Sequence, residues 1–210
     1  MTTLPVCQTL LLEPHNGVLH ITLNRPDSRN AMSLQMVKEL RAVLAAVRDD
    51  QTTRALVIGG AGGHFCAGGD IKDMAGARAR SQGEGRGDAY RELNRAFGAM
   101  LEEFQQASQV VIALLEGAVL GGGFGLACVS DVAITASGAK FGLPEVTLGL
   151  LPGGGGIVRM VRLLGLQTAL PLLMEGRQFG VAQAQALGLI HDTAENEQEL
   201  LDKADRKSVV

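Results

Sequence analysis

The chain has 210 residues, of which 46% are hydrophobic, and its formal net charge is −3 at pH 7. This length favours one packed domain, and the hydrophobic fraction argues against a disordered chain. Because there is no basic excess, neither nucleic acid nor an anionic membrane surface is expected as a main partner.

The first part of the chain alternates strand and helix patterns. Apolar and polar residues alternate over 19–23, which predicts a strand. A helix is expected next, with Ser33 as its N-cap and apolar positions at helical spacing from Met36 to Val47. The continuous apolar run Ala55–Ile58 is typical of a strand buried in a parallel sheet. It leads into a glycine-rich loop, Gly59–Asp70.

The middle of the chain repeats this alternation. Residues 75–89 are polar and glycine-rich without a period, and we interpret them as a mobile surface loop. Apolar residues at helical spacing from Tyr90 to Phe104 predict an amphipathic helix. Val110–Leu115 and Val132–Thr135 predict two more buried strands, with a small-residue helix at about 122–129 between them.

The last part is expected to be mainly helical over residues 157–190. From Glu195 the chain is polar, short and weakly patterned. Strands that alternate with helices predict an α/β fold built from βαβ-like units. We expect a core domain at residues 1–194 and a short polar tail at 195–210.

The cysteines and the N-terminus indicate the compartment. Cys7, Cys66 and Cys128 form no CxxC pair and no Cys/His metal pattern, so no metal site is expected. An odd cysteine count, after an N-terminus without a basic segment and apolar run, is typical of a reducing compartment. We expect a soluble cytoplasmic protein without a membrane partner. Cys66 lies beside a glycine loop, but no motif supplies it with a base, and we interpret it as a small packing residue.

Glycine clusters at Gly59–Gly69, Gly117–Gly125 and Gly149–Gly156 suggest a site built largely from main chain. The first two follow buried strands, and the second opens a predicted helix, whose first N–H groups lack partners. No Lys-Ser or Lys-Thr follows these glycines, and Leu126 breaks a GxGxxG pattern, so neither nucleotide-binding motif is present. Two alternatives remain: tight turns without chemistry, or an oxyanion hole for a carbonyl that becomes an enolate.

Four segments resemble the crotonase superfamily of enoyl-CoA hydratases and isomerases. They are NRPDSRNAMS, HFCAGGDIKDM, EGAVLGGGFGLACVSDVAI and FGLPEVTLGLLPGGGG, in the order that the superfamily has them. The resemblance runs from about residue 6 to residue 190. It implies a crotonase-like ββα spiral with helices, whose C-terminal helical part looks missing or shortened here. It also implies a homotrimer or a dimer of trimers.

The resemblance assigns roles to residues of the glycine loops. The N–H groups of Gly69 and Gly122 are expected to form the oxyanion hole. The substrate is expected to be an acyl-CoA, and coenzyme A enters only as part of this thioester, so no resident cofactor is expected. Six residues are expected to hold its coenzyme A part: Arg29, Ala31, Ala67, Asp70, Ile71 and Lys72.

The catalytic carboxylates depart from the usual hydratase pattern. Hydratases of the superfamily commonly carry a glutamate three residues after the middle glycine of GGG, where this chain has Gly125. The second glutamate, that of the PE motif, is present as Glu145. Burial would raise its pKa toward a useful range. We therefore expect Glu145 to act as the only acid/base.

The reaction stays open between related possibilities. The N-terminal segment and GGGFGLACVSDVAI resemble a group of hydratases that act on isohexenylglutaconyl-CoA in acyclic terpene breakdown, which also has glycine in place of the first glutamate. PGGGGIVRMVRLLGL is closer to multifunctional fatty-acid oxidation enzymes. We expect an enoyl-CoA hydratase, with a branched glutaconyl chain as one candidate substrate. The alternatives are a 3-enoyl-CoA to 2-enoyl-CoA isomerase and a non-catalytic acyl-CoA-binding protein.

Overall fold

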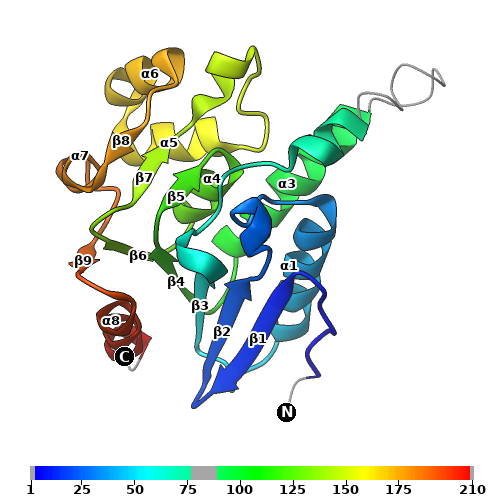
Figure 1. The fold of residues 1–210 in the computed structure, drawn as a ribbon. Coiled ribbons are helices and arrows are strands. Elements are labelled where there is room, and N and C mark those ends of the chain that lie inside the picture. The colour runs from blue at the N-terminus through cyan, green and yellow to red at the C-terminus, as the bar shows by residue number, and fades with distance from the viewer. Residues whose placement is uncertain (1–2, 77–88, 209–210) are drawn as a thin grey trace.

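A computed structural model describes residues 3–76 and 89–208 of the chain. It has the α/β architecture expected from the sequence, with helices around a central sheet (Figure 1). Of the predicted loop at residues 75–89, positions 77–88 lie outside the described residues, whereas 75 and 76 are helical. No helix in the described part of the chain is long and apolar enough to cross a membrane.

The central sheet has six strands in the order β1-β2-β3-β4-β6-β9. Only the pair formed by β1 and β2 is antiparallel. The predicted strands are all present, and their apolar runs are buried as expected for parallel strands covered on both faces, apart from the first residues Val110, which is exposed, and Val132, which is half-buried. The bounds are β1 Leu10–His15, β2 Val18–Leu23, β3 Ala55–Gly60, β4 Val110–Leu115, β6 Val132–Ala136 and β9 Asp192–Ala194.

A smaller sheet lies beside the central one in the order β5-β7-β8. Its strands are β5 Ala118–Leu120, β7 Lys140–Gly142 and β8 Phe179–Gly180. Three phenylalanines pack against each other here: Phe141 stacks on Phe179 at 6.0 Å, and the edge of Phe124 meets both rings. The aromatic contacts hold the helix that follows the GGG turn, Gly122–Ala127, against β7 and β8.

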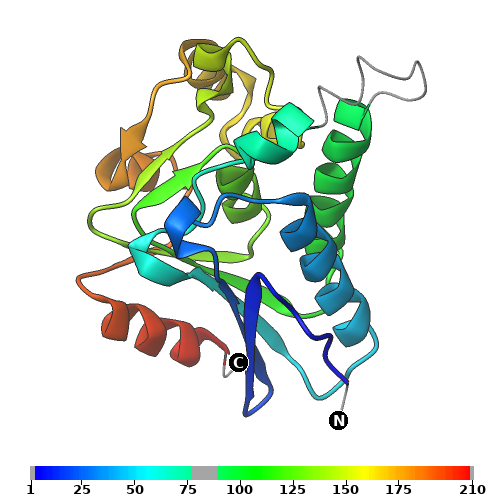
Figure 2. The same ribbon diagram turned by 45° about the vertical axis from the view of Figure 1, so that its right-hand side comes forward.

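Helices cover opposite faces of the central sheet (Figure 2). Helices α1 (Leu34–Val47) and α3 (Ala89–Gln105) pack against each other on one face, and the Ser33 hydroxyl caps α1 by accepting from Met36 N–H at 3.1 Å. Further helices are α4 Gly122–Ala127, α5 Gly156–Leu164, α6 Leu166–Glu175, α7 Val181–Ala186 and α8 Glu197–Ser208, and residues 71–76 are helical as well. The mainly helical character predicted for residues 157–190 is therefore confirmed.

Residues 197–208 differ from the weakly patterned polar segment expected from the sequence. They form α8, which contacts β4 and β6 on the face opposite α1 and α3. Leu200 and Ala204, four residues apart, are buried against Val57 and Ile134 of the sheet. Two apolar positions on one helix face are enough to dock a helix that is polar elsewhere, because the sheet supplies the rest of the apolar surface.

Candidate active site

The glycines and the glutamate predicted for catalysis come together around one cavity. Gly69, Gly122 and Glu145 all line a cavity of about 520 Å³. They arrive from three separate segments: the loop after β3, the first turn of α4, and the 3-10 turn Pro144–Leu148. Such a meeting of a carboxylate and two glycine loops is the geometry that enolate chemistry needs.

Two backbone hydrogen bonds hold the Gly69 loop beside the strand that leads to Gly122. The N–H of Cys66 donates to the carbonyl of Ala118 at 2.9 Å, and the N–H of Leu120 donates to the carbonyl of Cys66 at 2.9 Å. This is a short piece of parallel pairing between the loop and β5. It places the two glycine loops next to each other, as an oxyanion hole with one donor from each loop requires.

The N–H groups of both glycines are left out of the backbone pairing around them. On its other side the Gly69 loop pairs with Met32, whose N–H donates to Gly68 and whose carbonyl accepts from Asp70, at 2.8 and 3.0 Å. This pattern skips the N–H of Gly69. Gly122 is the first residue of α4, so its N–H is one of those that have no acceptor within the helix. Both glycines line the cavity, so their N–H groups are candidate donors to an oxygen bound there.

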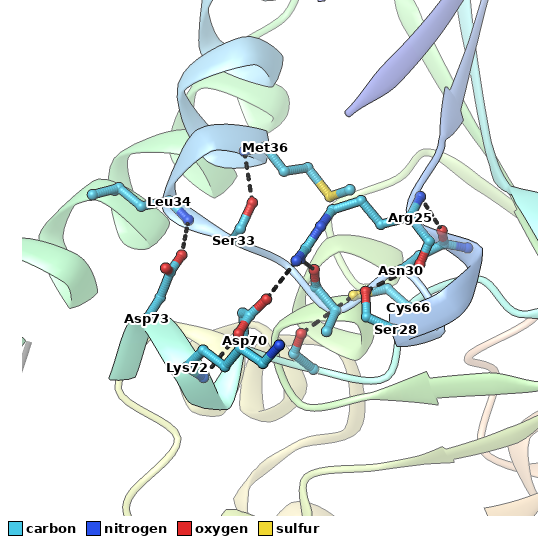
Figure 3. A network of polar contacts seen from close by, with 12 residues as sticks. Arg25, Ser28, Asn30, Ser33, Leu34, Met36, Cys66, Asp70, Lys72 and Asp73 are labelled. Atoms are coloured by element: carbon cyan, nitrogen blue, oxygen red, sulfur yellow. Dashed lines mark hydrogen bonds and ion pairs between the residues drawn. The ribbon is translucent and has the colours of Figure 1, made fainter. Parts of the chain in front are cut away.

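Arg25 ties the loop to the segment before α1, as Figure 3 shows. Its guanidinium donates to the Ala31 carbonyl and to Asp70 Oδ2, the latter at 2.7 Å. Burial alone would raise the pKa of Asp70, but hydrogen bonds from Arg25 and from the Lys72 N–H outweigh it and hold that pKa below its usual range. Asp70 is therefore an ionised structural partner of Arg25 that also lines the cavity.

Glu145 lines the cavity, and one of its carboxylate oxygens has no partner among the described residues. Its Oε2 atom is buried and accepts no hydrogen bond from residues 3–76 or 89–208. Desolvation raises the pKa of Glu145, opposed only by a hydrogen bond from its own backbone. A carboxylate in this setting takes up a proton more readily than one in water, which suits general acid/base work.

Gly121 leaves room for this carboxylate. It has φ +52°, and a Cβ placed on it would lie 2.9 Å from Glu145 Oε1 and 3.3 Å from Gly68 Cα. Only a residue without a side chain lets the GGG turn, the Gly68 turn and the glutamate meet here.

Gly125 lies in a tightly packed place. It is buried in α4, and a Cβ on it would lie 3.2 Å from Leu101 Cδ1 and 3.6 Å from Gly156 Cα. One turn earlier on α3, the ring of Phe97 would come within 2.8 Å of a Cβ on Gly122. A side chain at position 125, where the superfamily's first glutamate would begin, would thus make a tight contact with Leu101 of α3.

The cavity also has a lining that the motifs did not reveal. Asp73 is already engaged, because its Oδ2 accepts from the Leu34 N–H at 2.6 Å. Asn94 lines the cavity from α3, next to Gly153. The helical spacing of Leu93 and Phe97 predicted that both lie on one face of a helix. It did not predict that this face lines the cavity. The apolar part of the lining is Met32, Met74, Leu93, Phe97, Leu150 and Leu151.

The residues expected to hold coenzyme A lie in two neighbouring segments. The Ala67 N–H donates to the Arg29 carbonyl at 3.0 Å, which joins the segment before α1 to the Gly69 loop. Arg29, Ile71 and Lys72 are exposed. Of the six expected residues, Asp70 alone belongs to the lining of the described cavity, and the others, Arg29, Ala31, Ala67, Ile71 and Lys72, lie outside it. Cys66, interpreted as a packing residue, is fully buried, and burial raises its pKa to about 11.

Known proteins resemble this chain over most of its length. Residues 13–207 match the family model described as enoyl-CoA hydratase/isomerase. The chain is 38% identical over 190 residues to the mitochondrial enoyl-CoA hydratase domain-containing protein 2 of Bos taurus, which covers 90% of this chain and 62% of the relative. It is 34% identical over 183 residues to 2,3-dehydroadipyl-CoA hydratase of Escherichia coli, which covers 87% of this chain and 68% of the relative. The chain therefore spans less than two thirds of the bovine relative.

Solved structures agree with the sequence comparison. The fold matches that of AtuE from Pseudomonas aeruginosa with a TM-score of 0.89 at 60% identity, over 95% of this chain and 75% of that one. It matches an enoyl-CoA hydratase/isomerase from Marinobacter aquaeolei with a TM-score of 0.91 at 52% identity, over 96% of this chain and 76% of that one. The chain belongs to the enoyl-CoA hydratase/isomerase family of the crotonase superfamily.

Proposed function

We propose that this chain is an enoyl-CoA hydratase that uses one carboxylate. The observation that carries the proposal is the common cavity of Gly69, Gly122 and Glu145, with a buried oxygen of Glu145 that has no partner in the described part of the chain. The raised pKa of this carboxyl group, which lines the cavity, suits a group that exchanges a proton with a ligand bound there. Relatives named as enoyl-CoA hydratases support the reaction class.

The reaction follows from the placement of these groups. The N–H groups of Gly69 and Gly122 bind the thioester oxygen and stabilise the negative charge that it gains as water adds to C3. Glu145 takes the proton of that water as its oxygen bonds to C3. The protonated Glu145 then returns a proton to C2, and the enolate collapses to the 3-hydroxyacyl thioester. One carboxylate thus serves in turn as base and acid.

An isomerase is the second candidate, and Gly125 favours it. Moving a double bond from C3 to C2 requires one group that removes a proton from C2 and returns it at C4, and a single glutamate is sufficient. Hydration additionally requires that the water be held, which a glutamate at position 125 would help to do. A chain that binds acyl-CoA without turnover is the third candidate.

A direct substrate comparison tests the three candidates. A 2-enoyl-CoA and a 3-enoyl-CoA of the same chain length would be offered to the purified protein, and the absorbance of the conjugated thioester would be followed. Loss of absorbance with the 2-enoyl substrate supports the hydratase. A gain with the 3-enoyl substrate alone supports the isomerase. Binding of coenzyme A without any change in absorbance would contradict both enzymatic assignments.

The substrate class is proposed from the cavity walls and from the motifs. The apolar lining suits a hydrocarbon acyl chain, and a branched glutaconyl chain is the candidate suggested by the motifs. Arg29, Ala31 and Ala67, together with Asp70, Ile71 and Lys72, are proposed to hold the coenzyme A part. Support comes from the hydrogen bond that joins their two segments. A panel with linear, branched and carboxylated chains would rank these substrates by kcat/KM.

Assembly as a homotrimer or a dimer of trimers is proposed as well, in the cytoplasm. Large apolar side chains near the cavity are open to solvent, among them Leu148, Leu151 and Met174 at 66%, 81% and 69% exposure. Apolar surface of this kind usually marks a contact with another chain. The bacterial relatives support the location. Light scattering at several protein concentrations measures the assembly, and a monomer at all of them would contradict it.

A further inference from the structure

The parallel pairing that joins the Gly69 loop to β5 is very short. It consists of the two hydrogen bonds that Cys66 makes, from its N–H to Ala118 and from the Leu120 N–H to its carbonyl. Gly69 follows three residues after Cys66, and Gly122 follows two residues after Leu120. The contacts that extend this pairing on the N-terminal side of Cys66 and Ala118 therefore help to set the distance between the two proposed oxyanion donors.

The pairing shifts by one residue at its upstream end. The N–H of Phe65, rather than that of His64, donates to the carbonyl of Glu116 at 2.8 Å. The His64 carbonyl has turned away and accepts from Asn30 Nδ2 at 2.7 Å. The buried Ala118 N–H consequently has no backbone acceptor in this loop, and it donates to Nδ1 of the His64 ring at 3.1 Å. An imidazole nitrogen has replaced a backbone carbonyl as the acceptor, as happens where a bulge interrupts a ladder.

The neighbouring turn is shaped around this ring. Gly117 has φ +50°, and a Cβ on it would lie 2.4 Å from His64 Nδ1 and 2.3 Å from the Gly63 carbonyl oxygen. The Gly117 carbonyl in turn accepts from the Lys140 N–H of β7 at 2.7 Å. The backbone of the Gly117 turn, just before β5, therefore packs closely against the His64 ring. A change of the side chain at position 64 should loosen this turn.

We propose that His64 is a positioning residue of the oxyanion hole, acting through the Ala118 N–H on the spacing of Gly69 and Gly122. The inference rests on the proposed function, because only enolate chemistry makes that spacing matter. His64 does not line the described cavity, so it acts on the donors rather than on the substrate. To accept this bond, Nδ1 must carry no proton, which in a neutral imidazole places the ring proton on Nε2.

Three substitutions separate the acceptor from the bulk of the side chain. In His64→Asn, Oδ1 stands at the same distance along the side chain as Nδ1, so the bond to Ala118 is kept. In His64→Ala the acceptor is lost, and in His64→Gln it moves one bond further out. We expect kcat to fall on the order of 10-fold to 100-fold in the alanine and glutamine variants, because a small misplacement of catalytic groups has effects of this size. KM should change far less, and asparagine should restore most of kcat.

His191 provides a matched control. Its Nδ1 also accepts a backbone N–H, that of Ala133, at 3.0 Å, but at the β6–β9 edge of the central sheet. His191→Ala removes the same kind of hydrogen bond and should lower the melting temperature while leaving kcat unchanged. A fall in kcat for both alanine variants would mean that general destabilisation explains the loss, which would overturn the positioning role.

Two further measurements keep this inference separate from the proposed function. A bound 2-enoyl thioester should show a red shift of its absorbance when the oxyanion hole polarises its carbonyl, and this shift should shrink in His64→Ala and return in His64→Asn. Hydrogen exchange of the Ala118 amide should be faster in His64→Ala alone. Unchanged exchange would overturn the inference about His64 whatever the activity. Absence of turnover and of a red shift in the unmodified protein would overturn the proposed function instead.

Discussion

Two walls of the cavity are built in different ways. The wall that carries Gly69 is held by backbone hydrogen bonds to Met32 on one side and to β5 on the other, and by the Arg25–Asp70 pair. The wall that carries Glu145 is a 3-10 turn followed by a run of glycines, with a carboxylate oxygen that has no partner among the described residues. The backbone donors that we propose for the oxyanion hole are held in place by the fold, whereas the carboxylate that we propose as acid/base keeps an oxygen without a described partner. This division of rigidity and reactivity is what enolate chemistry requires.

The largest effect is expected from removing the reactive group alone. In Glu145→Gln the shape of the side chain is kept, but it can no longer take up a proton. Hydration or isomerisation should fall by about 10²-fold to 10⁴-fold. Binding of coenzyme A thioester, measured by calorimetry, should persist because the backbone donors remain. A variant that keeps its rate would show that another group supplies the proton transfer.

A second large effect is expected where the two walls meet. Gly121→Ala puts a Cβ 2.9 Å from Glu145 Oε1 at a backbone angle of φ +52°. We expect activity to fall on the order of 10²-fold, since the glutamate must move, and stability to fall by about 1–3 kcal/mol because of the strained backbone.

Gly165→Ala is the control for the strain alone. Gly165 has φ +75°, and a Cβ there meets nothing within 4 Å. In urea denaturation, Gly165→Ala should lose about as much stability as Gly121→Ala. Its turnover should stay normal. Equal turnover in both alanine variants would contradict the proposed contact between Gly121 and Glu145.

The stability of the wall that carries Gly69 should depend on pH through the ionisation of Asp70. Its folded pKa is held below the unfolded value of about 3.9, so its contribution is fully present above that value and is lost as pH falls through the folded pKa. Asp70→Asn should cost about 1–3 kcal/mol at neutral pH, because the charged partner Arg25 loses its acceptor. Urea denaturation from pH 3 to pH 7 would show the difference from the unmodified protein shrinking at the acid end. Glu175→Gln, which breaks the exposed pair with Arg177, should cost only about 0–1 kcal/mol.

The smallest effect is expected on the stability of the fold, which burial of the charged Glu145 carboxylate lowers. The folded pKa of Glu145 is raised, so the folded chain favours the protonated form, and stability is lost as pH rises from the unfolded value of about 4.3 through the folded value. Glu145→Gln has no such charge. It should melt at a higher temperature than the unmodified protein at pH 7 and at a similar temperature at pH 4. A lower melting temperature at pH 7 would show that the carboxylate stabilises the fold.

The sequence by itself determined the local parts of this protein. Apolar runs at Ala55–Ile58 and Val110–Leu115 predicted buried parallel strands, and Ser33 predicted the start of α1, because each depends on neighbouring residues only. The glycine loops and Glu145 were found in the same way, from motifs a few residues long. Residues 197–208 were missed as a helix, because their two buried apolar positions matter only once the sheet is beside them.

Only the tertiary structure decided how these parts meet. Three features join residues that are far apart in the chain: the cavity shared by Gly69, Gly122 and Glu145, the close approach of Leu101 to Gly125, and the hydrogen bond from the Ala118 N–H to the His64 ring. No local sequence pattern predicts such contacts, because they depend on how distant segments of the chain pack together. The motifs therefore indicate the candidate reactive groups, and the packing of strands, turns and helices specifies where those groups stand relative to one another.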